Sequence, residues 1–443
     1  MVSSLHGVSP AHVRASEEND PRTLLPGGMP YKSGRPGGGT IMGSHQAHPR
    51  RLRFAVLAAV ASLAAGVLIT SAVAAPTSGV GGTARPHLKG TITIGAAFPL
   101  TGGTASLGVD QQRAVVLAES AINSGSGVLG RKLKVITEDT EGTSVGAVQA
   151  ARKLVTVNNV PLVVGEILSS DSVPMGKYLQ QQHVPMISPG ASSDDMGTIG
   201  NDIFSTMAPD SIGMKSAANT LYKAGYRSIA ILVPNNSYGT NLNDQLRKYF
   251  TQAGGQIKTS ILYTEGQSSY TGELTQLENS GAQIYCYGTY LPDAATIIQD
   301  AFQLNIKPTK FFGLYLSVDA AGPHANAAAG QAGFDFATPN NGSVFARVYK
   351  AKYHKAAWSP YSANTYDAII MAAKAINMAH SAKPAAIQAA LKKIGRSGFV
   401  GPATGLIRLD GRGERVTQVY GLFTVASDGS LKHLKGLPPP SGP

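Results

Sequence analysis

From Gly90 onward, short apolar runs alternate with segments in which apolar residues recur at helical spacing. Runs of four to eight residues rich in Val, Ile, Tyr and Phe predict strands. Two series are expected, separated near Pro209. The first holds Thr91–Phe98, Lys132–Asp139, Pro161–Val164 and Pro185–Ile187, and the second holds Ser228–Val233, Gln256–Tyr263, Gln283–Tyr287 and Lys310–Gly313.

Between these strands, the segments 147–155, 214–222 and 294–302 repeat apolar residues at i, i+3, i+4, i+7 and i+8. That spacing predicts amphipathic helices with one face on a sheet. Pro292 fits a first helical turn, and Gly225 fits a carboxyl-terminal cap. Strands that alternate with helices indicate parallel sheets covered on both faces. We therefore predict an α/β protein of two Rossmann-like lobes.

After Gly333 the sequence pattern predicts helices over Tyr361–Met378 and Pro384–Ile394. A hairpin of Gly405–Leu409 and Val416–Val425 is expected to follow. Asp410 and Gly411 supply its turn. We expect three crossings between the lobes, near Ala208, Phe336–Pro339 and Thr404, which form a hinge. The predicted domains are lobe 1 (90–208 and 338–404), lobe 2 (209–337 and 405–433) and a Pro-rich tail (434–443).

The first 89 residues predict an export leader. Residues 1–53 lack apolar periodicity and are expected to be disordered. Basic residues up to Arg53 then precede the uncharged segment 54–75, which fits a signal peptide cut after Ala74. A retained membrane anchor is the alternative, because about 20 apolar residues can span a bilayer. Residues 76–89 read as a linker.

Charge and cysteine content narrow the possible functions. The net charge of +12 is spread singly along the chain, so we expect no nucleic-acid partner. Cys286 is the only cysteine, which excludes an intramolecular disulfide. The sequence contains no phosphate-binding loop, no Gly-x-Ser-x-Gly, no Cys-x-x-Cys and no His-Glu-x-x-His. We therefore predict a protein that is not an enzyme, with no metal and no cofactor.

Ligands of open α/β sheets bind beyond the carboxyl ends of the strands. Two such places are rich in serine, at 165–170 and 188–193. Serine hydroxyls and free N–H groups at helix starts form a good receptor for a carboxylate. Helix capping by Ser169, Ser192 and Asp171 is the alternative explanation. In the second series, Tyr238 and Tyr290 would place aromatic rings and phenols at the lobe's mouth, although tyrosine is also common at loop edges.

The order of these segments resembles the branched-chain amino-acid binding proteins of the type I periplasmic-binding fold. The resemblance covers about Gly90 to Asp428 and rests on the opening 94–102, GSGVLGRKLK at 125–134, the two serine turns, NSYG at 236–239, YGTYLPD at 287–293 and Tyr366-Asp367-Ala368. It implies a clamp that captures a small molecule outside the cytoplasm for the membrane permease of an ABC importer. We expect a monomer.

The resemblance also implies which residues bind ligand. Those that carry over directly are Ser169, Gly190, Ala191, Ser192, Tyr238 and Tyr290. Leu107 stands where the family often has an aromatic residue, and Tyr315 stands where it has a glutamate that grips the ligand's amine. A sensor subunit of the same fold, working with a separate signalling chain, is the alternative function.

The departure at Tyr315 bears on the ligand, because a buried ammonium without an opposing charge is costly. Glu166, Asp293 and Asp319 are acids that could replace the missing glutamate. Unless one of them does, we expect leucine, isoleucine and valine to bind less well than an uncharged or aromatic carboxylate or amide. Leu107 would also widen the apolar side of the pocket.

Overall fold

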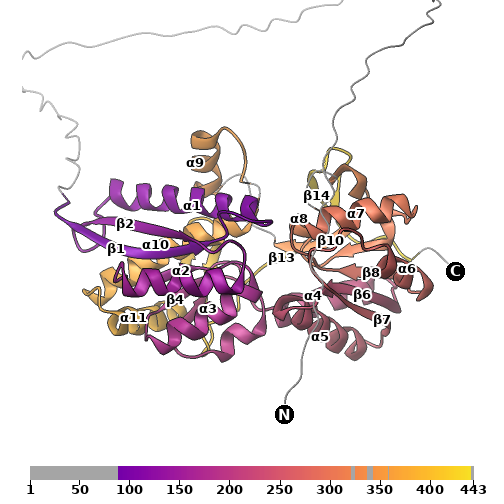
Figure 1. Cartoon of the computed structure of the whole chain (residues 1–443), viewed down its shortest axis with the longest axis horizontal. Helices are drawn as coiled ribbons and strands as arrows, with labels where there is room; N and C mark the ends of the chain where they lie inside the picture. Colours follow the sequence, from indigo (N-terminus) through magenta and orange to yellow (C-terminus); the bar gives the residue numbers. More distant parts are fainter. Residues whose placement is uncertain (1–87, 321–324, 337–342, 358, 441–443) are drawn as a thin grey trace, which may run out of the picture. The chain divides into compact units, whose positions relative to one another are not determined.

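The computed structural model describes residues 88–320, 325–336, 343–357 and 359–440. The predicted leader lies outside these residues up to position 87. Figure 1 shows the helices and strands along the chain. Within the described residues, no helix combines the length and the apolar character needed to cross a membrane.

The first lobe is built on a five-stranded parallel sheet with the order β2-β1-β3-β4-β5. Four of its strands were predicted, two of them with the observed bounds. The fifth was missed because its three residues, Ile203–Ser205, do not form a continuous apolar run, unlike those around β3 and β4. The strands are β1 (Thr91–Phe98), β2 (Lys132–Asp139), β3 (Val163–Gly165), β4 (Met186–Ser188) and β5 (Ile203–Ser205).

Alternate residues of β1 pack on opposite faces of this sheet, as expected for strands buried on both sides. Ile94 belongs to the core shared with α1 and α10, whereas Ala97 belongs to the core shared with α2 and α3. Helix α1 packs against α10, and α2 packs against α3. The helices of this lobe are α1 (Ala105–Ser124), α2 (Ser144–Thr156), α3 (Ser169–Gln181), η1 (Asp194–Thr198), α9 (Val344–Tyr353), α10 (Tyr361–Ala379) and α11 (Pro384–Ser397).

The second lobe is built on a seven-stranded sheet with the order β14-β13-β10-β9-β8-β6-β7. Strands β6 to β10 are parallel, but β13 pairs antiparallel with β10, and β14 antiparallel with β13. The two-lobed α/β class is confirmed, and this sheet departs from a purely parallel pattern at one edge. Its strands are β6 (Ser228–Pro234), β7 (Gln256–Tyr263), β8 (Ile284–Tyr287), β9 (Phe311–Gly313), β10 (Ala332–Phe336), β13 (Tyr420–Val425) and β14 (Leu431–His433).

The helices of the second lobe follow the predicted amphipathic segments. Gly225 has φ +102° just after α4, which confirms the expected carboxyl-terminal cap. Pro292 immediately precedes α7 rather than lying inside its first turn. The helices are α4 (Asp210–Lys223), α5 (Ser237–Gln252), α6 (Thr271–Asn279), α7 (Asp293–Gln303), η2 (Pro308–Lys310), α8 (Leu316–Asp319) and η3 (Ala325–Ala328).

The predicted hairpin of 405–409 and 416–425 is present only next to its Asp410-Gly411 turn, where Leu409 and Arg415 form an antiparallel bridge and Val416 N–H donates to Arg408 O at 2.9 Å. The rest of the predicted pairing is wrong. β12 (Gly405–Ile407) pairs with β11 (Phe399–Gly401), whereas β13 joins the second sheet. The segment between them stays with the first lobe, because Ser205 N–H donates to Gly413 O at 2.9 Å and Arg415 Nη1 donates to Thr206 O at 3.0 Å. The third crossing therefore lies between residues 415 and 420 and not near Thr404.

Candidate functional site

A pocket lies at the carboxyl ends of the strands, where residues of both sheets meet. It holds about 360 Å³ of space between atoms, including its opening to solvent. Six of the eight predicted site residues line it, and Ala191 and Tyr315 do not. The lining residues are Leu107, Ile167, Leu168, Ser169, Gly190, Ser192, Tyr238, Thr289, Tyr290, Val318 and Tyr361.

The two serine turns form one continuous surface. Ser169 Oγ accepts hydrogen bonds from the N–H groups of Ser192 and Ser193, both at 3.2 Å. The O–H proton of Ser169 remains available to donate. The capping explanation is wrong for both predicted serines, because Leu168 is the N-cap of α3 and Ser193 is the N-cap of η1. Ser169 and Ser192 thus line the pocket and are not the N-caps of these helices.

Two tyrosines of the second lobe face these turns. The rings of Tyr238 and Tyr290 stack with their centroids 4.8 Å apart and 12° between planes. Tyr290 Oη accepts a hydrogen bond from Ser169 N–H at 3.1 Å, which links the two lobes directly. Burial raises the pKa of both phenols well above the ordinary value. They therefore act as neutral donors and acceptors.

Two phenols at the pocket make no hydrogen bond within the described residues. Tyr238 is buried at the start of α5, and Tyr361 is partly buried at the start of α10. Both line the pocket, and burial raises the pKa of both hydroxyls. Each can donate to a ligand oxygen. Tyr361 was missed because Tyr361 begins a helix after Pro360 and reads as an ordinary first-turn residue.

Tyr315 lies behind the pocket. Its hydroxyl donates to Asp210 Oδ1 at 2.6 Å, and Asn241 Nδ2 donates to the other carboxylate oxygen at 2.9 Å. Burial raises the pKa of Asp210 to about 7, although hydrogen bonds from Tyr315, Asn241 and Ser192 oppose the rise. The expected glutamate is therefore replaced by a phenol that satisfies a different buried acid. Asp210 was missed because it reads as a first-turn residue after Pro209.

Ala191 lies beside the pocket lining without contributing to it. Its side chain is buried in the core of the first lobe, and its N–H donates to Ser188 Oγ at 3.2 Å. Ser188 Oγ in turn donates to Glu166 O at 2.8 Å. The backbone at Ala191 thus shapes the second serine turn, while Gly190 and Ser192 on either side of it face the pocket.

The three acids proposed as substitutes for the missing glutamate have other partners. Glu166 accepts from Thr140 Oγ1 and from the N–H groups of Ile167 and Leu168. Asp319 accepts from Thr289 and from Tyr315 N–H. Burial raises the pKa of Glu166 and of Asp319 to about 8 each. Neither acid lines the pocket.

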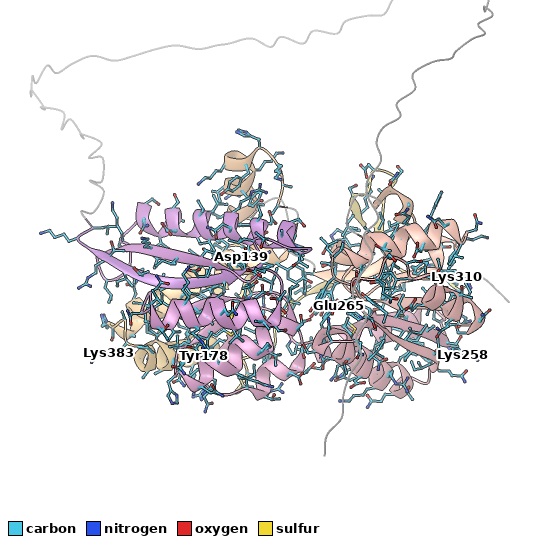
Figure 2. All side chains as sticks on the ribbon, in the orientation of Figure 1. Asp139, Tyr178, Lys258, Glu265, Lys310 and Lys383 are labelled. Carbon is cyan, nitrogen blue, oxygen red and sulfur yellow. The ribbon has the colours of Figure 1, made fainter. Side chains whose placement is uncertain are left out.

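The third acid, Asp293, begins α7, accepts from Gly266 N–H at 3.0 Å and does not line the pocket. Two acids labelled in Figure 2, Asp139 and Glu265, also accept hydrogen bonds from loop residues. Asp139 accepts from the N–H groups of Leu100 and Thr101, and Glu265 accepts from Asn236 Nδ2. Among the described residues that line the pocket, none carries a carboxylate, an ammonium, a guanidinium or an imidazole.

The remaining lining residues that the sequence interpretation missed are apolar or small. Ile167 and Leu168 follow β3, and Val318 lies on α8. Thr289 belongs to the YGTYLPD segment, but the sequence analysis assigned a binding role only to Tyr290 of that segment. In the part of the chain that the structure describes, no group of three or more His, Cys, Asp or Glu side chains could hold a metal ion.

Two lobes with a neutral pocket between the carboxyl ends of their strands define a solute-binding protein of the two-lobed clamp type. A periplasmic binding protein family matches residues 91–430, and the chain belongs to this family. The family consists of extracytoplasmic solute-binding proteins of transporters and not of enzymes, as predicted.

The relatives agree with the predicted family. A Leu/Ile/Val-binding protein homologue from Brucella abortus is 24% identical over 324 residues, covering 68% of this chain and 81% of that protein. A leucine binding protein from Thermotoga maritima has a similar fold, with TM-score 0.69, 22% identity, and coverage of 79% of this chain and 99% of that one.

A third protein with this fold is a solute binding protein of an ABC transporter from Rhodopseudomonas palustris, solved in complex with p-hydroxybenzoic acid. Its TM-score is 0.69 at 19% identity, and the match covers 78% of this chain and 96% of that one. The predicted resemblance to substrate-binding proteins of ABC transporters is thus confirmed.

Proposed function

We propose that this protein captures a small carboxylate with an apolar or aromatic body and no cationic amine, and delivers it to the membrane permease of an ABC importer. One observation carries this proposal: the pocket between the lobes is lined by hydroxyls, phenols and apolar groups without a charged side chain. The ligand's own charge must therefore be met by dipoles.

The serine turns suit the carboxylate end of such a ligand. Ser169 begins α3 and lines the pocket, so the positive amino-terminal end of that helix dipole lies there and favours negative charge. The Ser169 hydroxyl adds a donor, whereas the Ser192 hydroxyl is bonded to Asp210. Tyr290 Oη, which accepts from Ser169 N–H, can turn its own proton to a carboxylate oxygen beside it. These donors support binding of an anion without a lysine or arginine.

An amine on the ligand finds no equivalent partner. The buried acids nearest the pocket already accept hydrogen bonds from the protein, and Asp210 is covered by Tyr315 and Asn241. An ammonium left in this pocket without a counter-charge would cost several kcal/mol. This supports ligands in which the α-amino group is absent or replaced by an uncharged group.

The free phenols of Tyr238 and Tyr361 point to a second polar group on the ligand. Each phenol that is covered by a bound ligand without receiving a partner would lose its hydrogen bonds to water. A hydroxyl or carbonyl on the ligand would restore them, and the stacked rings of Tyr238 and Tyr290 favour a flat body. The solved relative that holds p-hydroxybenzoic acid supports this ligand class.

The proposed mechanism is closure of the two lobes around the ligand. Contacts already cross between the lobes at Tyr290 and Ser169, and at Asn241 Nδ2, which donates to Asp194 Oδ2 at 3.1 Å. A ligand that bonds to the serine turns and to the tyrosines adds to these contacts only in the closed form. Such a ligand shifts the population toward closure.

A thermal-shift screen on ligand-stripped protein tests the proposal. Two matched pairs differ only by the amine: leucine against 4-methylpentanoate, and phenylalanine against 3-phenylpropanoate. A third pair, benzoate against 4-hydroxybenzoate, tests the second polar group. A ligand at about 100 times its dissociation constant adds about 2.7 kcal/mol of stability. We expect the acids without an amine to stabilise the protein. Stabilisation by the amino acids and not by their partners would overturn the proposal.

A further inference from the structure

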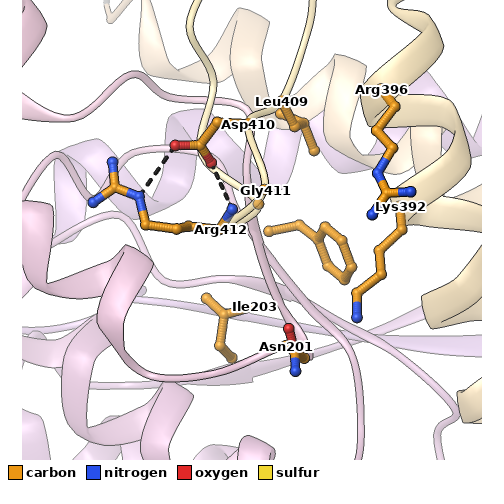
Figure 3. Close-up of a pocket in the computed structure, with 10 residues that line it drawn as sticks. Asn201, Ile203, Lys392, Arg396, Leu409, Asp410, Gly411 and Arg412 are labelled. Carbon is orange, nitrogen blue, oxygen red and sulfur yellow. Dashed lines mark hydrogen bonds and ion pairs between the residues drawn. The ribbon is translucent and has the colours of Figure 1, made fainter.

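A second cavity lies in the first lobe, at the opposite end of its sheet from the ligand pocket (Figure 3). It contains about 310 Å³ of space between atoms, walled by the start of β5, by α11 and by the turn 409–413. β5 runs parallel to β4, so the amino end at Ile203 is remote from the strand ends that carry the serine turns. The two cavities share no lining residue.

The turn 409–413 is fixed in place on both sides of this cavity. Leu409 N–H donates to Gly395 O of α11 at 3.0 Å, and Gly413 O accepts from Ser205 N–H of β5 at 2.9 Å. Gly413 has φ +85°, and a Cβ atom there would lie 2.2 Å from Ile203 O. The wall is therefore built by the fold and requires glycine at this close approach.

The charge of the wall is unbalanced. It contains three cations and one carboxylate. Asp410 is bonded to Arg412, with Oδ2 3.1 Å from Nε, and Glu414 lies 3.7 Å from the same guanidinium. Arg412 is thus neutralised. Lys392 and Arg396 form no ion pair or hydrogen bond within the described residues.

These two cations lie one helical turn apart on α11, where like charges repel each other. Lys392 is partly buried, so its ammonium is less well screened by water than on an open surface. Arg396 lies in the last turn of α11 and also stabilises that helix end. Figure 3 shows the Lys392 ammonium on the side of Asn201, whose amide can donate to an oxygen, and shows Arg396 further along α11 on the same side of the cavity.

We infer that this cavity binds a phosphate-type oxyanion, with Lys392 and Arg396 as its charged contacts and Asn201 as a neutral one. A guanidinium presents two parallel N–H donors that match two oxygens of a phosphate, and an ammonium adds a point charge. The oxyanion would cancel the repulsion between the two cations. The same chemistry is offered by free phosphate and by the headgroup of an anionic lipid, which the experiment separates.

Calorimetric titration with inorganic phosphate, against chloride at equal ionic strength, tests the site. Lys392→Met and Arg396→Gln should each weaken phosphate binding about fivefold, because each removes one charge-assisted contact at a solvent-accessible site. Lys393→Met is the matched control, since Lys393 is an exposed neighbour on α11 outside the cavity. All variants should keep the wild-type melting temperature, and their affinity for ligands of the pocket between the lobes should be unchanged.

Sedimentation with phosphatidylglycerol vesicles is the second arm. Vesicle binding that Lys392→Met weakens and phosphate competes with would identify a lipid headgroup, and phosphate binding without vesicle binding would identify a free oxyanion. Either result supports the site. The inference is overturned if phosphate gives no more heat than chloride and vesicles do not bind, or if Lys393→Met weakens binding as much as Lys392→Met.

Discussion

The two lobes line the ligand pocket with groups of different chemistry. The first-lobe wall contains the two serine turns, in which Ser169 Oγ accepts from the N–H groups of Ser192 and Ser193, together with the side chains of Leu107, Ile167, Leu168 and Tyr361. The second-lobe wall consists of phenol rings, with Tyr238 stacked on Tyr290 and the acids Asp210 and Asp319 held behind them. The serine turns of the first lobe thus provide hydrogen-bond donors in fixed directions, whereas the stacked rings of the second lobe determine the shape of the pocket.

This difference indicates how the pocket selects a ligand. We expect the serine turns to recognise a carboxylate whatever body the ligand carries, because the Ser169 hydroxyl and the amino-terminal end of α3 lie at the pocket. The aromatic wall decides what else the ligand carries. There the acid that could meet an amine is covered by Tyr315, so under the proposed function we expect the second lobe to exclude positive charge and to accept flat or apolar bodies. Substitutions in the two walls should therefore differ in which ligands they affect.

Ser169→Ala should have the largest effect on binding and should weaken all carboxylate ligands alike. Ser192→Ala should also weaken them, because it removes the bond between Asp210 and the second serine turn. A charge-assisted hydrogen bond contributes roughly 1.5–3 kcal/mol, which corresponds to a loss of about tenfold or more. Ser237→Ala is the matched control, because Ser237 also begins a helix but lies outside the pocket. Titration calorimetry measures the effect. Wild-type affinity in both serine variants would remove the carboxylate assignment.

Asp210→Asn should change how stability depends on pH. Burial raises the pKa of Asp210 from an unfolded value near 3.8 to about 7. A raised pKa gives stability that is fully present below pH 4 and is lost as pH rises through 7. Between pH 5 and 8, this group should cost the wild type roughly 2 kcal/mol.

Urea unfolding at pH 5 and pH 8 measures this loss in both proteins. The difference between the two pH values should shrink in Asp210→Asn. An identical pH dependence in the variant would mean that Asp210 is ionised at both pH values. The pairing with Tyr315 would then place a negative charge directly behind the aromatic wall, and exclusion of ligand amines would lose its physical basis.

Tyr238→Phe and Tyr361→Phe should affect ligands selectively. A neutral hydrogen bond contributes about 0.5–1.5 kcal/mol, so each variant should bind 4-hydroxybenzoate roughly threefold to tenfold more weakly. Benzoate, which lacks the second polar group, should bind each variant at least as tightly as it binds the wild type, because no phenol is then covered without a partner. Tyr178→Phe on α3 is the control outside the pocket. An equal loss of affinity for both ligands would mean that the two phenols contribute to binding only through packing and not through hydrogen bonds.

Ligand-induced closure should give the smallest signal. Small-angle scattering of the full chain should show a smaller radius of gyration when a saturating ligand is added, because contacts shared by the two lobes favour the closed form. Asn241→Ala, which removes the bond to Asp194, should leave the unliganded protein more open. An unchanged radius with verified saturation would contradict the clamp mechanism.

Sequence pattern predicted the long strands well. Thr91–Phe98, Lys132–Asp139 and Gln256–Tyr263 have the expected bounds because eight residues carry enough β-branched and apolar character. β5 and β10 were missed, since β5 ends in Ser205 and β10 contains Gly333 and Asp335, which interrupt an apolar run. The hairpin at 405–425 was predicted too long, because the strand partners of β12 and β13 come from other parts of the chain.

The site was predictable where segments follow a fixed order and not where it depends on tertiary contacts. The serine turns and the two tyrosines were found from their positions after strands. Nothing in the sequence indicated that Tyr315 would turn away from the pocket to Asp210, because residues 105 positions apart are joined only by the fold. Tyr361 reaches the pocket from α10 for the same reason.

The most direct measurement is the affinity of leucine compared with that of 4-methylpentanoate, two molecules that differ only by the ammonium. Calorimetric titration of ligand-stripped protein should show that the acid without the amine binds more tightly, and isoleucine and valine should be as weak as leucine. Submicromolar binding of leucine that Glu166→Gln or Asp319→Asn abolishes would contradict this result, and would identify a buried acid that opens to meet the amine.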